Sequence, residues 1–354
     1  MIRPVLATIS EWAPFQLDAL GLVTIFGAKE MNMSIGNLVQ SWATEWVPVL
    51  GSYAVANNEL TEPGQGFILY NITDGIMATD VAAWFTRWLM SYQLNYTSTT
   101  IRLRTSGRPM STTHRTCAFL IGACVMLLSL CFSILTADPW GIANSAIMAF
   151  QVLVRQGMVG QLRGSVDRAV EAIQDNPGPG VKVFLTLPNG KAVTILGLRQ
   201  MVVNCILSEA RPVQPRYYFM LRVTGWALFG GHAITLGMSN LFNQMITVAV
   251  LLLGTYVTAI HVGDFPQAIG ARLRLEIDMG DPTWNRSRAY ARLNMSPEEE
   301  DNMVHWNMMP QRSNLFWWNR YTTTHKDGKQ AGPPANSNVR VIEVAADSHS
   351  STST

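Results

Sequence analysis

The chain has 354 residues, of which 48% are hydrophobic and only 14% are charged, and its formal net charge at pH 7 is +2. A nearly neutral chain without a basic stripe is not expected to bind nucleic acid, and its four cysteines are too few for a disulfide framework. The low charge and the positive mean hydropathy favour a membrane protein.

The segment 117–137, CAFLIGACVMLLSLCFSILTA, carries this interpretation because it contains no charged residue. It is long enough for a helix to cross the hydrocarbon core of a bilayer. Asp138 and Pro139 follow it, and these are a good helix N-cap and a residue favoured at the first helical position. A second helix should therefore begin at once over 140–159, which predicts a first transmembrane hairpin spanning 117–160.

A second hairpin is predicted over 217–262, with spans at 217–238 and 244–262. In the cytoplasmic segment 161–216 that joins the two hairpins, Asn-Gly lies between two β-rich runs, which predicts a β-hairpin over 181–198. Residues 99–105 alternate and are a candidate third strand. The expected fold is therefore mainly α and multi-pass, with four spans in two helical hairpins and a small cytoplasmic module containing the β-hairpin.

The N-terminal region, 1–116, contains an amphipathic helix at 77–93 with an aromatic face. Two interpretations remain open: the helix lies in the membrane interface, or it packs within its own domain. A third, in which 79–95 crosses the bilayer, would place Arg87 at membrane depth, where a charge is costly. Only that third arrangement would put Asn32 and Asn71 outside the cell as N-glycosylation sites.

The tail begins with a mixed segment, 263–325, in which Ser296-Pro297 followed by three glutamates predicts a helix near 297–308. Residues 326–354 are rich in Gly, Pro, Asn, Ser and Thr, and are predicted to be disordered. Basic residues flank the predicted spans on the side of the long segments, whereas the two short loops carry none. By the positive-inside rule, the long segments are cytoplasmic in a protein of the secretory pathway or plasma membrane.

Three of the polar residues inside the predicted spans are the main candidate site. Asn144 and Gln151 are seven residues apart on one helix, and His232 lies near the middle of the third span. Polar groups at membrane depth either join helices or mark a functional path. The alternative for His232 is a neutral imidazole that forms a hydrogen bond to a neighbouring helix.

Cys117, Cys124 and Cys131 share one helix face because they are seven residues apart. Successive thiols on this helix are about 10 Å apart, which excludes one shared metal ion. We expect no metal site and interpret these cysteines as small packing residues. Cys117, close to Arg115 at the membrane boundary, is also a candidate for palmitoylation.

Small residues four positions apart occur in the second predicted hairpin, at Ala227 and Gly231 and at Gly254 and Thr258. Such pairs let membrane helices approach closely. They predict tight packing and do not specify a partner.

Enzyme and cofactor signatures are missing from the sequence, which contains no G-x-S-x-G, H-E-x-x-H, Walker A or G-x-G-x-x-G motif. We therefore expect no cofactor and favour a non-enzymatic scaffold or sensor that acts through its cytoplasmic segments. An oligomeric transporter or channel subunit is the alternative, and a membrane-embedded enzyme is the third. The expected partners are the lipid bilayer and either further copies of the chain or a cytoplasmic protein.

Two stretches carry a resemblance to known proteins: VKVFLTLPNGKAVTI at 181–195, and the tail pattern that runs from Trp306 to Trp317-Trp318-Asn319-Arg320-Tyr321. They resemble uncharacterised multi-pass integral membrane proteins of filamentous fungi. The resemblance implies a membrane protein and no particular activity.

Overall fold

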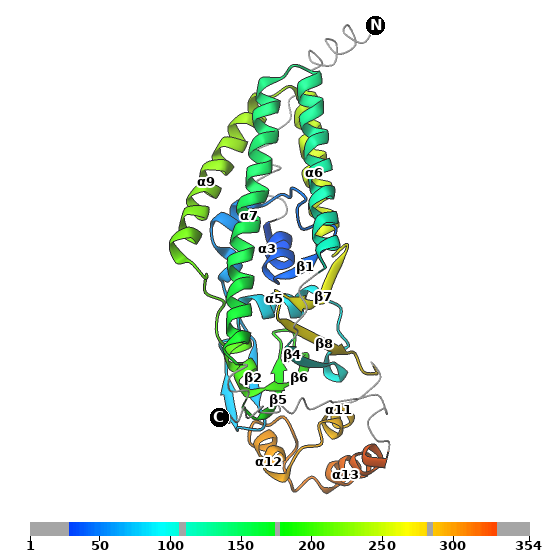
Figure 1. Ribbon diagram of the computed structural model, residues 1–354. Coiled ribbons are helices and arrows are strands. Elements are labelled where there is room, and N and C mark those ends of the chain that lie inside the picture. Colours follow the sequence, from blue (N-terminus) through cyan, green and yellow to red (C-terminus); the bar gives the residue numbers. More distant parts are fainter. Residues whose placement is uncertain (1–27, 106–110, 174–177, 282–285, 331–354) are drawn as a thin grey trace, which may run out of the picture. The chain divides into compact units, whose positions relative to one another are not determined.

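The computed structural model describes residues 28–105, 111–173, 178–281 and 286–330 (Figure 1). The chain divides into two compact units, Met1–Trp284 and Asn285–Thr354. The first unit combines long helices with a β-sheet, and the second contains short helices.

The first unit is built on an eight-stranded sheet with the order β1-β7-β8-β4-β6-β5-β2-β3. Only β4 and β6 run parallel, and the other described neighbours are antiparallel. The predicted β-hairpin and the strand at 99–105 are confirmed as β5, β6 and β4. The bounds are β1 (Val39–Ser41), β2 (Ile68–Asn71), β3 (Ile76–Ala78), β4 (Thr100–Thr105), β5 (Gly180–Thr186), β6 (Ala192–Leu198), β7 (Asp264–Ile269) and β8 (Leu273–Asp278).

The sheet overturns the predicted fold class, because the protein is mixed α/β and is not mainly α with one small β-hairpin. The sequence does not predict strands β1, β2, β3, β7 and β8, and the segment 263–325, predicted as a cytoplasmic tail with one helix, supplies β7 and β8. These strands are three to six residues long. Alternation over so few residues is a weak signal, and strand stability depends mostly on neighbours that are distant in sequence.

Short helices and turns pack around the sheet, and α5 is the most deeply buried of them. Its Trp84, Phe85 and Trp88 are at most 1% exposed, and the Trp84 indole donates a hydrogen bond to the Cys205 carbonyl at 2.9 Å. The aromatic face of the predicted helix therefore packs within its own domain. The bounds are α3 (Ala28–Gly36), α4 (Ser52–Ala56), α5 (Ala83–Ser91), α8 (Arg199–Met201), the 3₁₀ helices η1 (Glu59–Thr61) and η2 (Tyr96–Ser98), and the π-helix η3 (Val202–Leu207).

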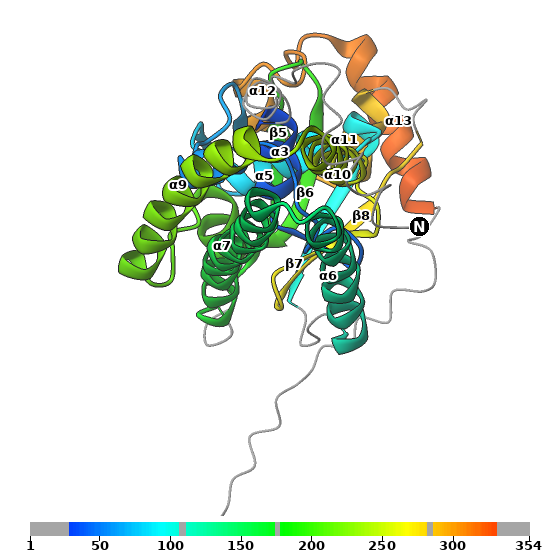
Figure 2. The same ribbon diagram turned by 90° about the horizontal axis from the view of Figure 1, so that it is seen from above.

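Four long helices stand at one end of this unit: α6 (Thr112–Leu135), α7 (Pro139–Glu171), α9 (Pro215–Met238) and α10 (Leu241–Ala259) (Figures 1 and 2). Helix α7 packs against α6 and α9, whereas α10 packs against α6 and α3. Helix α9 therefore packs mainly on α7 and does not form a close hairpin with α10.

Only α6 and α10 among the described helices are long and apolar enough to cross a membrane. The prediction of four spans in two helical hairpins is therefore wrong. Helix α7 contains Asn144, Gln151 and Arg155, and α9 contains Arg222 and His232. These polar residues lower the hydropathy of both helices.

The second unit contains α11 (Arg286–Arg292), α12 (Pro297–His305) and α13 (Leu315–Gln330). Helix α12 confirms the helix predicted near 297–308. It begins with a capping box in which the Ser296 side chain and the Glu299 side chain each bond the other's backbone amide. Most of the tail predicted to be disordered, from residue 331 onward, lies outside the described residues.

Candidate functional site

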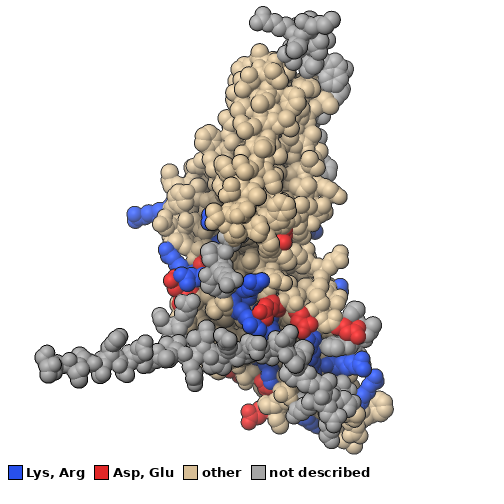
Figure 3. All heavy atoms as spheres, turned by 45° about the vertical axis from the view of Figure 1, so that its right-hand side comes forward, with Lys and Arg blue, Asp and Glu red and all other residues tan. Residues whose placement is uncertain are grey.

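The long helices bury several polar side chains between them and expose many large apolar ones. A domain that folds in water concentrates its large apolar side chains in the core, so this exposed apolar surface suits helices that face lipid. On the face shown in Figure 3, the half of these helices that lies away from the sheet is free of charged side chains. Buried polar residues include Ser129, Ser133, Asn144, Ser145, His232, Thr235, Asn243 and Thr247, whereas Leu120, Leu127, Ile134, Phe150, Phe219, Ile234, Leu253 and Tyr256 are at least half exposed.

Asp138 connects the two inter-helix loops at the end of the long helices. It is 4% exposed, and its Oδ2 accepts hydrogen bonds from the Asn240 amide and from Asn243 Nδ2, both at 2.8 Å. Asn243 Nδ2 also donates to Thr136 Oγ1 at 2.9 Å. The sequence identified Asp138 as an N-cap, and its Oδ1 does accept from the Trp140 amide at 3.1 Å. The structure adds the link between the α6–α7 loop and α10.

Asn144 joins three of the long helices. Its Nδ2 donates to Thr247 Oγ1 on α10 at 3.2 Å, and its Oδ1 accepts from Thr235 Oγ1 on α9 at 3.3 Å. Gln151 makes a separate link, from Nε2 to the Leu228 carbonyl at 3.3 Å. Thr235 and Thr247 were not anticipated, because threonine is common in apolar helices and gives no distinct signal.

His232 lies one turn before Thr235 on α9 and is 1% exposed. Neither of its ring nitrogens has a hydrogen-bond partner among the residues that the structure describes. The structure thus places His232 on the same helix as Thr235, which donates a hydrogen bond to Asn144. The imidazole itself forms no hydrogen bond to Asn144 or Gln151.

A non-helical stretch at 42–51, here called the inserted segment, runs from β1 to α4 between the long helices. Its Leu50 packs in a small buried cluster with Met148, Leu236, Val248 and Leu251. The Leu50 amide donates to Thr255 Oγ1 at 2.9 Å. Irregular backbone is tolerated in an apolar surrounding only where protein groups satisfy it, so the inserted segment depends on the helices around it.

Glycines make room for the inserted segment. A Cβ atom at Gly254 would collide with the carbonyl oxygen of Pro48, and one at Gly122 would collide with the carbonyl of Trp46. Trp46 also packs edge-on against Phe119, with the ring centroids 5.5 Å apart. Gly254 was expected to serve helix–helix contact, and it instead accommodates the inserted segment.

A charged cluster fixes the inserted segment to α7. Arg163 forms an ion pair with the Glu45 carboxylate, and Arg155 Nη2 donates to the Glu45 carbonyl at 2.6 Å. Arg163 Nε also donates to the Leu38 carbonyl at 2.9 Å. Arg155 is 6% exposed, so one segment between β1 and α4 receives two guanidinium groups from a single helix.

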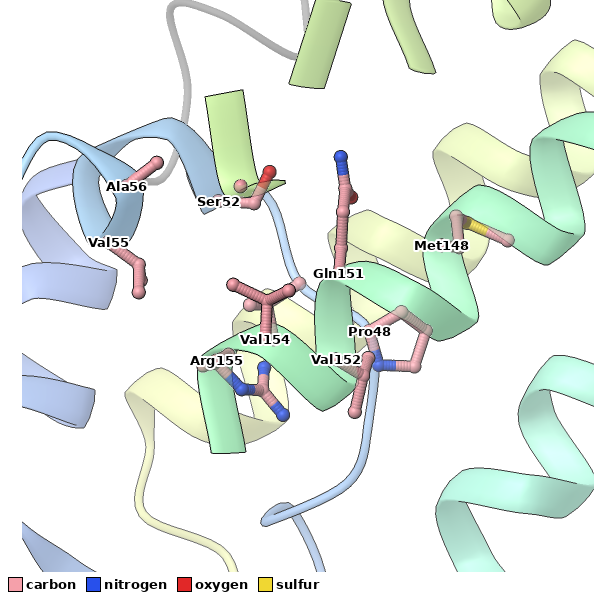
Figure 4. A pocket seen from close by; sticks show the side chains of 11 residues that line it. Pro48, Ser52, Val55, Ala56, Met148, Gln151, Val152, Val154 and Arg155 are labelled. Carbon is pink, nitrogen blue, oxygen red and sulfur yellow. The ribbon is translucent and has the colours of Figure 1, made fainter. Parts of the chain in front are cut away.

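A small cavity of about 20 Å³ lies where the inserted segment and α4 meet α7. Figure 4 shows Gln151, Val152 and Arg155 of α7 around it, together with Pro48 and Ser52. Arg155 also borders a second cavity of about 30 Å³. Each has room for about one or two water molecules and is much smaller than a typical small-molecule pocket.

The two candidate glycosylation residues are held in hydrogen bonds within the fold. Asn32 Oδ1 accepts from Arg87 Nε at 2.8 Å. Asn71 is 7% exposed, and its Nδ2 donates to Asp74 Oδ2 at 2.6 Å. A glycan on the Asn71 amide would therefore displace a bond of the folded state.

Two of the three cysteines of α6 point away from the rest of the chain. Cys124 and Cys131 are exposed, Cys117 is half-buried, and Cys205 of η3 is buried. Cys124 and Cys131 therefore do not pack against other parts of the same chain, and their interpretation as packing residues is wrong for a single copy. No group of His, Cys, Asp or Glu in the described ranges could hold a metal ion.

Comparisons with known proteins give no relative: no family model, no curated protein and no solved structure matches the chain.

Proposed function

We propose that the protein is a membrane-anchored sensor or scaffold whose α/β part faces the cytoplasm of a secretory-pathway or plasma membrane. Helices α6 and α10 are the candidate spans. The apolar exterior of the long helices and their polar interior support this proposal. The distribution of charge supports the orientation, because Arg115 lies in the first turn of α6 and Arg163 and Arg168 lie in the half of α7 that packs on the sheet, whereas the two loops at the other end carry only Asp138.

The continuity of α7 is the observation that carries the proposal. This helix has 33 residues and is therefore about 50 Å long. Its first half lies among the long helices, where Asn144 bonds α9 and α10. Its second half belongs to the core of the α/β part, where Leu162 and Val166 share one apolar cluster with Val183 and Ile195 of the sheet.

Two connections therefore join the long helices to the sheet. One is α7, and the other is the inserted segment, which Arg155 and Arg163 fix to α7. Because packed interiors transmit strain, a displacement of the helices in the bilayer would reach the sheet through both. This arrangement suits a protein that reports the state of the membrane to a soluble partner or holds that partner at the membrane.

Gly160 offers a direct test of this coupling, because it lies on α7 between Asn144 and Leu162 and a Cβ there would meet nothing within 4 Å. Gly160→Pro should break the helix at a cost of ~3 kcal/mol or more, and Gly160→Ala is the matched control. Hydrogen exchange of β5 and β6 is measured in nanodiscs of thin and thick lipids. We expect protection to change with thickness in the wild type and Gly160→Ala, and to become insensitive in Gly160→Pro. Protection that ignores thickness in all three proteins would contradict a sensor.

A transporter or channel subunit is the second candidate, favoured by the buried imidazole of His232, whose ring nitrogens find no partner in the described part of the chain. Asn144, Gln151 and His232 would then line a polar path between the helices, and several copies would be needed to complete it. Purified protein in liposomes distinguishes the two candidates. Ion or solute flux that is lost in His232→Leu would support transport, whereas flux equal to that of empty liposomes would favour the sensor or scaffold.

A further inference from the structure

Strands β4 and β8 carry arginines on the face of the sheet that points away from the core. Leu103 and Leu275 point into the core and are at most 6% exposed. Side chains alternate between the two faces of a strand, so Arg102 and Arg104 of β4 and Arg274 of β8 lie on the outer face, where all three are exposed. These three arginines are here called the basic face.

Two arginines of the basic face lie directly opposite each other in the antiparallel register. Arg104 pairs with Arg274 across β4 and β8, and like charges at such positions are destabilising. Arg104 Nε bonds the Glu276 carboxylate at 2.8 Å, whereas Arg102 and Arg274 form no ion pair within the described part of the chain. The basic face therefore retains an excess of positive charge.

The charge changes sign along β8. Arg272 and Arg274 lie at its start, next to the β7–β8 turn, whereas Glu276 and Asp278 lie toward its other end. The Arg272 guanidinium is already bonded to Glu171 at 3.0 Å. The basic end of the β4–β8 pair is therefore the end at the β7–β8 turn, and Arg274 is its uncompensated charge.

The height of this turn relative to the proposed bilayer follows from α6 and α7. Ser129 of α6 lies 3.1 Å from Ser145 of α7 between the two hydroxyl oxygens. The helices run in opposite directions and both rise about 1.5 Å per residue. Arg115, fourteen residues before Ser129, is thus level with residue 159, fourteen residues after Ser145. Arg115 is the charge that precedes the apolar stretch of α6, so this level marks the boundary of the proposed span.

Asp167 lies eight residues beyond that level on α7, which is about 12 Å. Its carboxylate accepts hydrogen bonds from the Ala271 amide at 2.8 Å and from the Arg272 amide at 2.9 Å, and so fixes the β7–β8 turn at this height. The headgroup layer extends about 5–7 Å beyond the hydrocarbon, and charges act over a Debye length of about 8 Å. The basic end of the strand pair is therefore within electrostatic reach of the headgroups.

We propose that the basic face binds the headgroups of anionic lipids in the leaflet next to the sheet. The negative surface potential of such a leaflet attracts basic residues close to it, and guanidinium groups match the geometry of phosphate and carboxylate oxygens. A bound headgroup would neutralise Arg104 and Arg274 where they oppose each other. The proposal rests on the membrane insertion put forward above and deepens the sensor function, because it names lipid charge as a property to which the sheet responds.

Lipid binding to the full chain in a nonionic detergent tests the proposal, with native mass spectrometry of bound short-chain phosphatidylserine and phosphatidylcholine as the readout. We expect phosphatidylserine to bind the more tightly, and Arg274→Gln to weaken its binding about fivefold. The control is Lys191→Gln, which removes one charge just before β6. Because β6 runs parallel to β4, Lys191 lies at the opposite end of the strands, and this variant should bind like the wild type. Equal affinity for the two lipids, or equal losses in both variants, would overturn the proposal.

The unfolding temperature in nanodiscs separates a lipid site from a structural role of Arg274. In phosphatidylcholine alone, Arg274→Gln should unfold at a higher temperature than the wild type, because it removes the repulsion with Arg104. Addition of phosphatidylserine should raise the unfolding temperature of the wild type by more than that of the variant. An equal rise in both proteins would contradict a headgroup site.

A membrane-impermeant maleimide separates failure of this proposal from failure of the membrane proposal. If Cys124 reacts in sealed vesicles, α6 lies outside the bilayer and both proposals are wrong. If Cys124 is protected and the wild type does not prefer phosphatidylserine, α6 is in lipid and only the headgroup site is wrong.

Discussion

The carboxylate of Asp138 accepts a hydrogen bond from the side-chain amide of Asn243 at 2.8 Å, and this contact ties the α6–α7 loop to α10. Two backbone amides also bond the same carboxylate. Charged acceptors bonded to several donors are among the stronger hydrogen-bonding groups of a protein. The interior of the long helices is thus organised by polar contacts that begin at this loop.

Replacement of Asp138 should loosen the connection. In Asp138→Asn, an NH₂ group would face at least one of the three donors, and we expect a loss of about 1–3 kcal/mol in unfolding free energy. Thermal unfolding in nanodiscs measures it. Asn240→Ala is the control, because the Asn240 side chain forms no capping bond. Equal stability of Asp138→Asn and the wild type would show that the carboxylate is not needed.

Gly254→Ala should displace the inserted segment, because the new methyl group would overlap the Pro48 carbonyl. Overpacking of this kind costs typically about 1–3 kcal/mol. The matched control is Gly237→Ala on α9, where a Cβ would meet nothing within 4 Å and a gain of up to about 1 kcal/mol is expected from helix propensity. Denaturant unfolding of both variants gives the comparison. If Gly254→Ala were the more stable of the two, the close approach of Pro48 to α10 would be wrong.

Removal of the Arg163 guanidinium should destabilise the junction of the sheet and the inserted segment. In Arg163→Met, the Glu45 carboxylate, whose side chain is 15% exposed, loses its ion-pair partner, and the Leu38 carbonyl loses a donor. Loss of one member of a buried pair costs up to about 3–5 kcal/mol, and solvent contact at this site should place the loss at the lower end. The control is Arg168→Met on the exposed face of α7, which should stay within about 0.5 kcal/mol of the wild type. Similar losses in both variants would argue against a special role for the cluster.

Glu209 predicts a pH dependence of stability in the α/β part. Its Oε2 accepts from the Ala83 amide at 2.9 Å, and burial raises the pKa of its carboxyl above the ordinary value of 4.5. A raised folded pKa means that the fold favours the protonated form. This contribution to stability is present below pH 4.5 and is lost as the pH rises through the folded pKa.

Glu209→Gln should therefore be more stable than the wild type at pH 8, with the difference vanishing near pH 4. Chemical unfolding across this range measures the effect, and Glu30→Gln, at an exposed position of α3, serves as control. A Glu209→Gln protein that is less stable at pH 8 would mean that attraction between the carboxylate and Arg87 outweighs the cost of burial.

Local sequence patterns were sufficient for the long helices and for the β5–β6 hairpin. A capped start at Asp138-Pro139 and an Asn-Gly turn act over a few residues, so they can be identified without knowledge of the fold. The edge of the sheet could not be predicted in this way. Val39 of β1 pairs with Ile269 of β7, and neither short strand has a local signal that separates it from a loop.

The candidate site was predicted only in part, for a related reason. Depth in an apolar segment was enough to single out Asn144, but its partners Thr235 and Thr247 come from distant helices. The inserted segment could not be recognised from the sequence, because Trp42, Trp46 and Val49 recur at the spacing of a helix although the segment is not helical. Gly122 and Gly254 indicate close packing at these positions of α6 and α10. Only the structure shows that the backbone of the inserted segment packs against them.

The most direct test of the membrane assignment is the reaction of Cys124 with a membrane-impermeant maleimide in sealed vesicles that contain the full chain. The side chain is exposed on the protein surface, so only lipid or a second copy within the bilayer would protect it. The account predicts no labelling in intact vesicles and complete labelling after denaturation in detergent. Rapid labelling in intact vesicles would contradict the assignment of α6 to the bilayer.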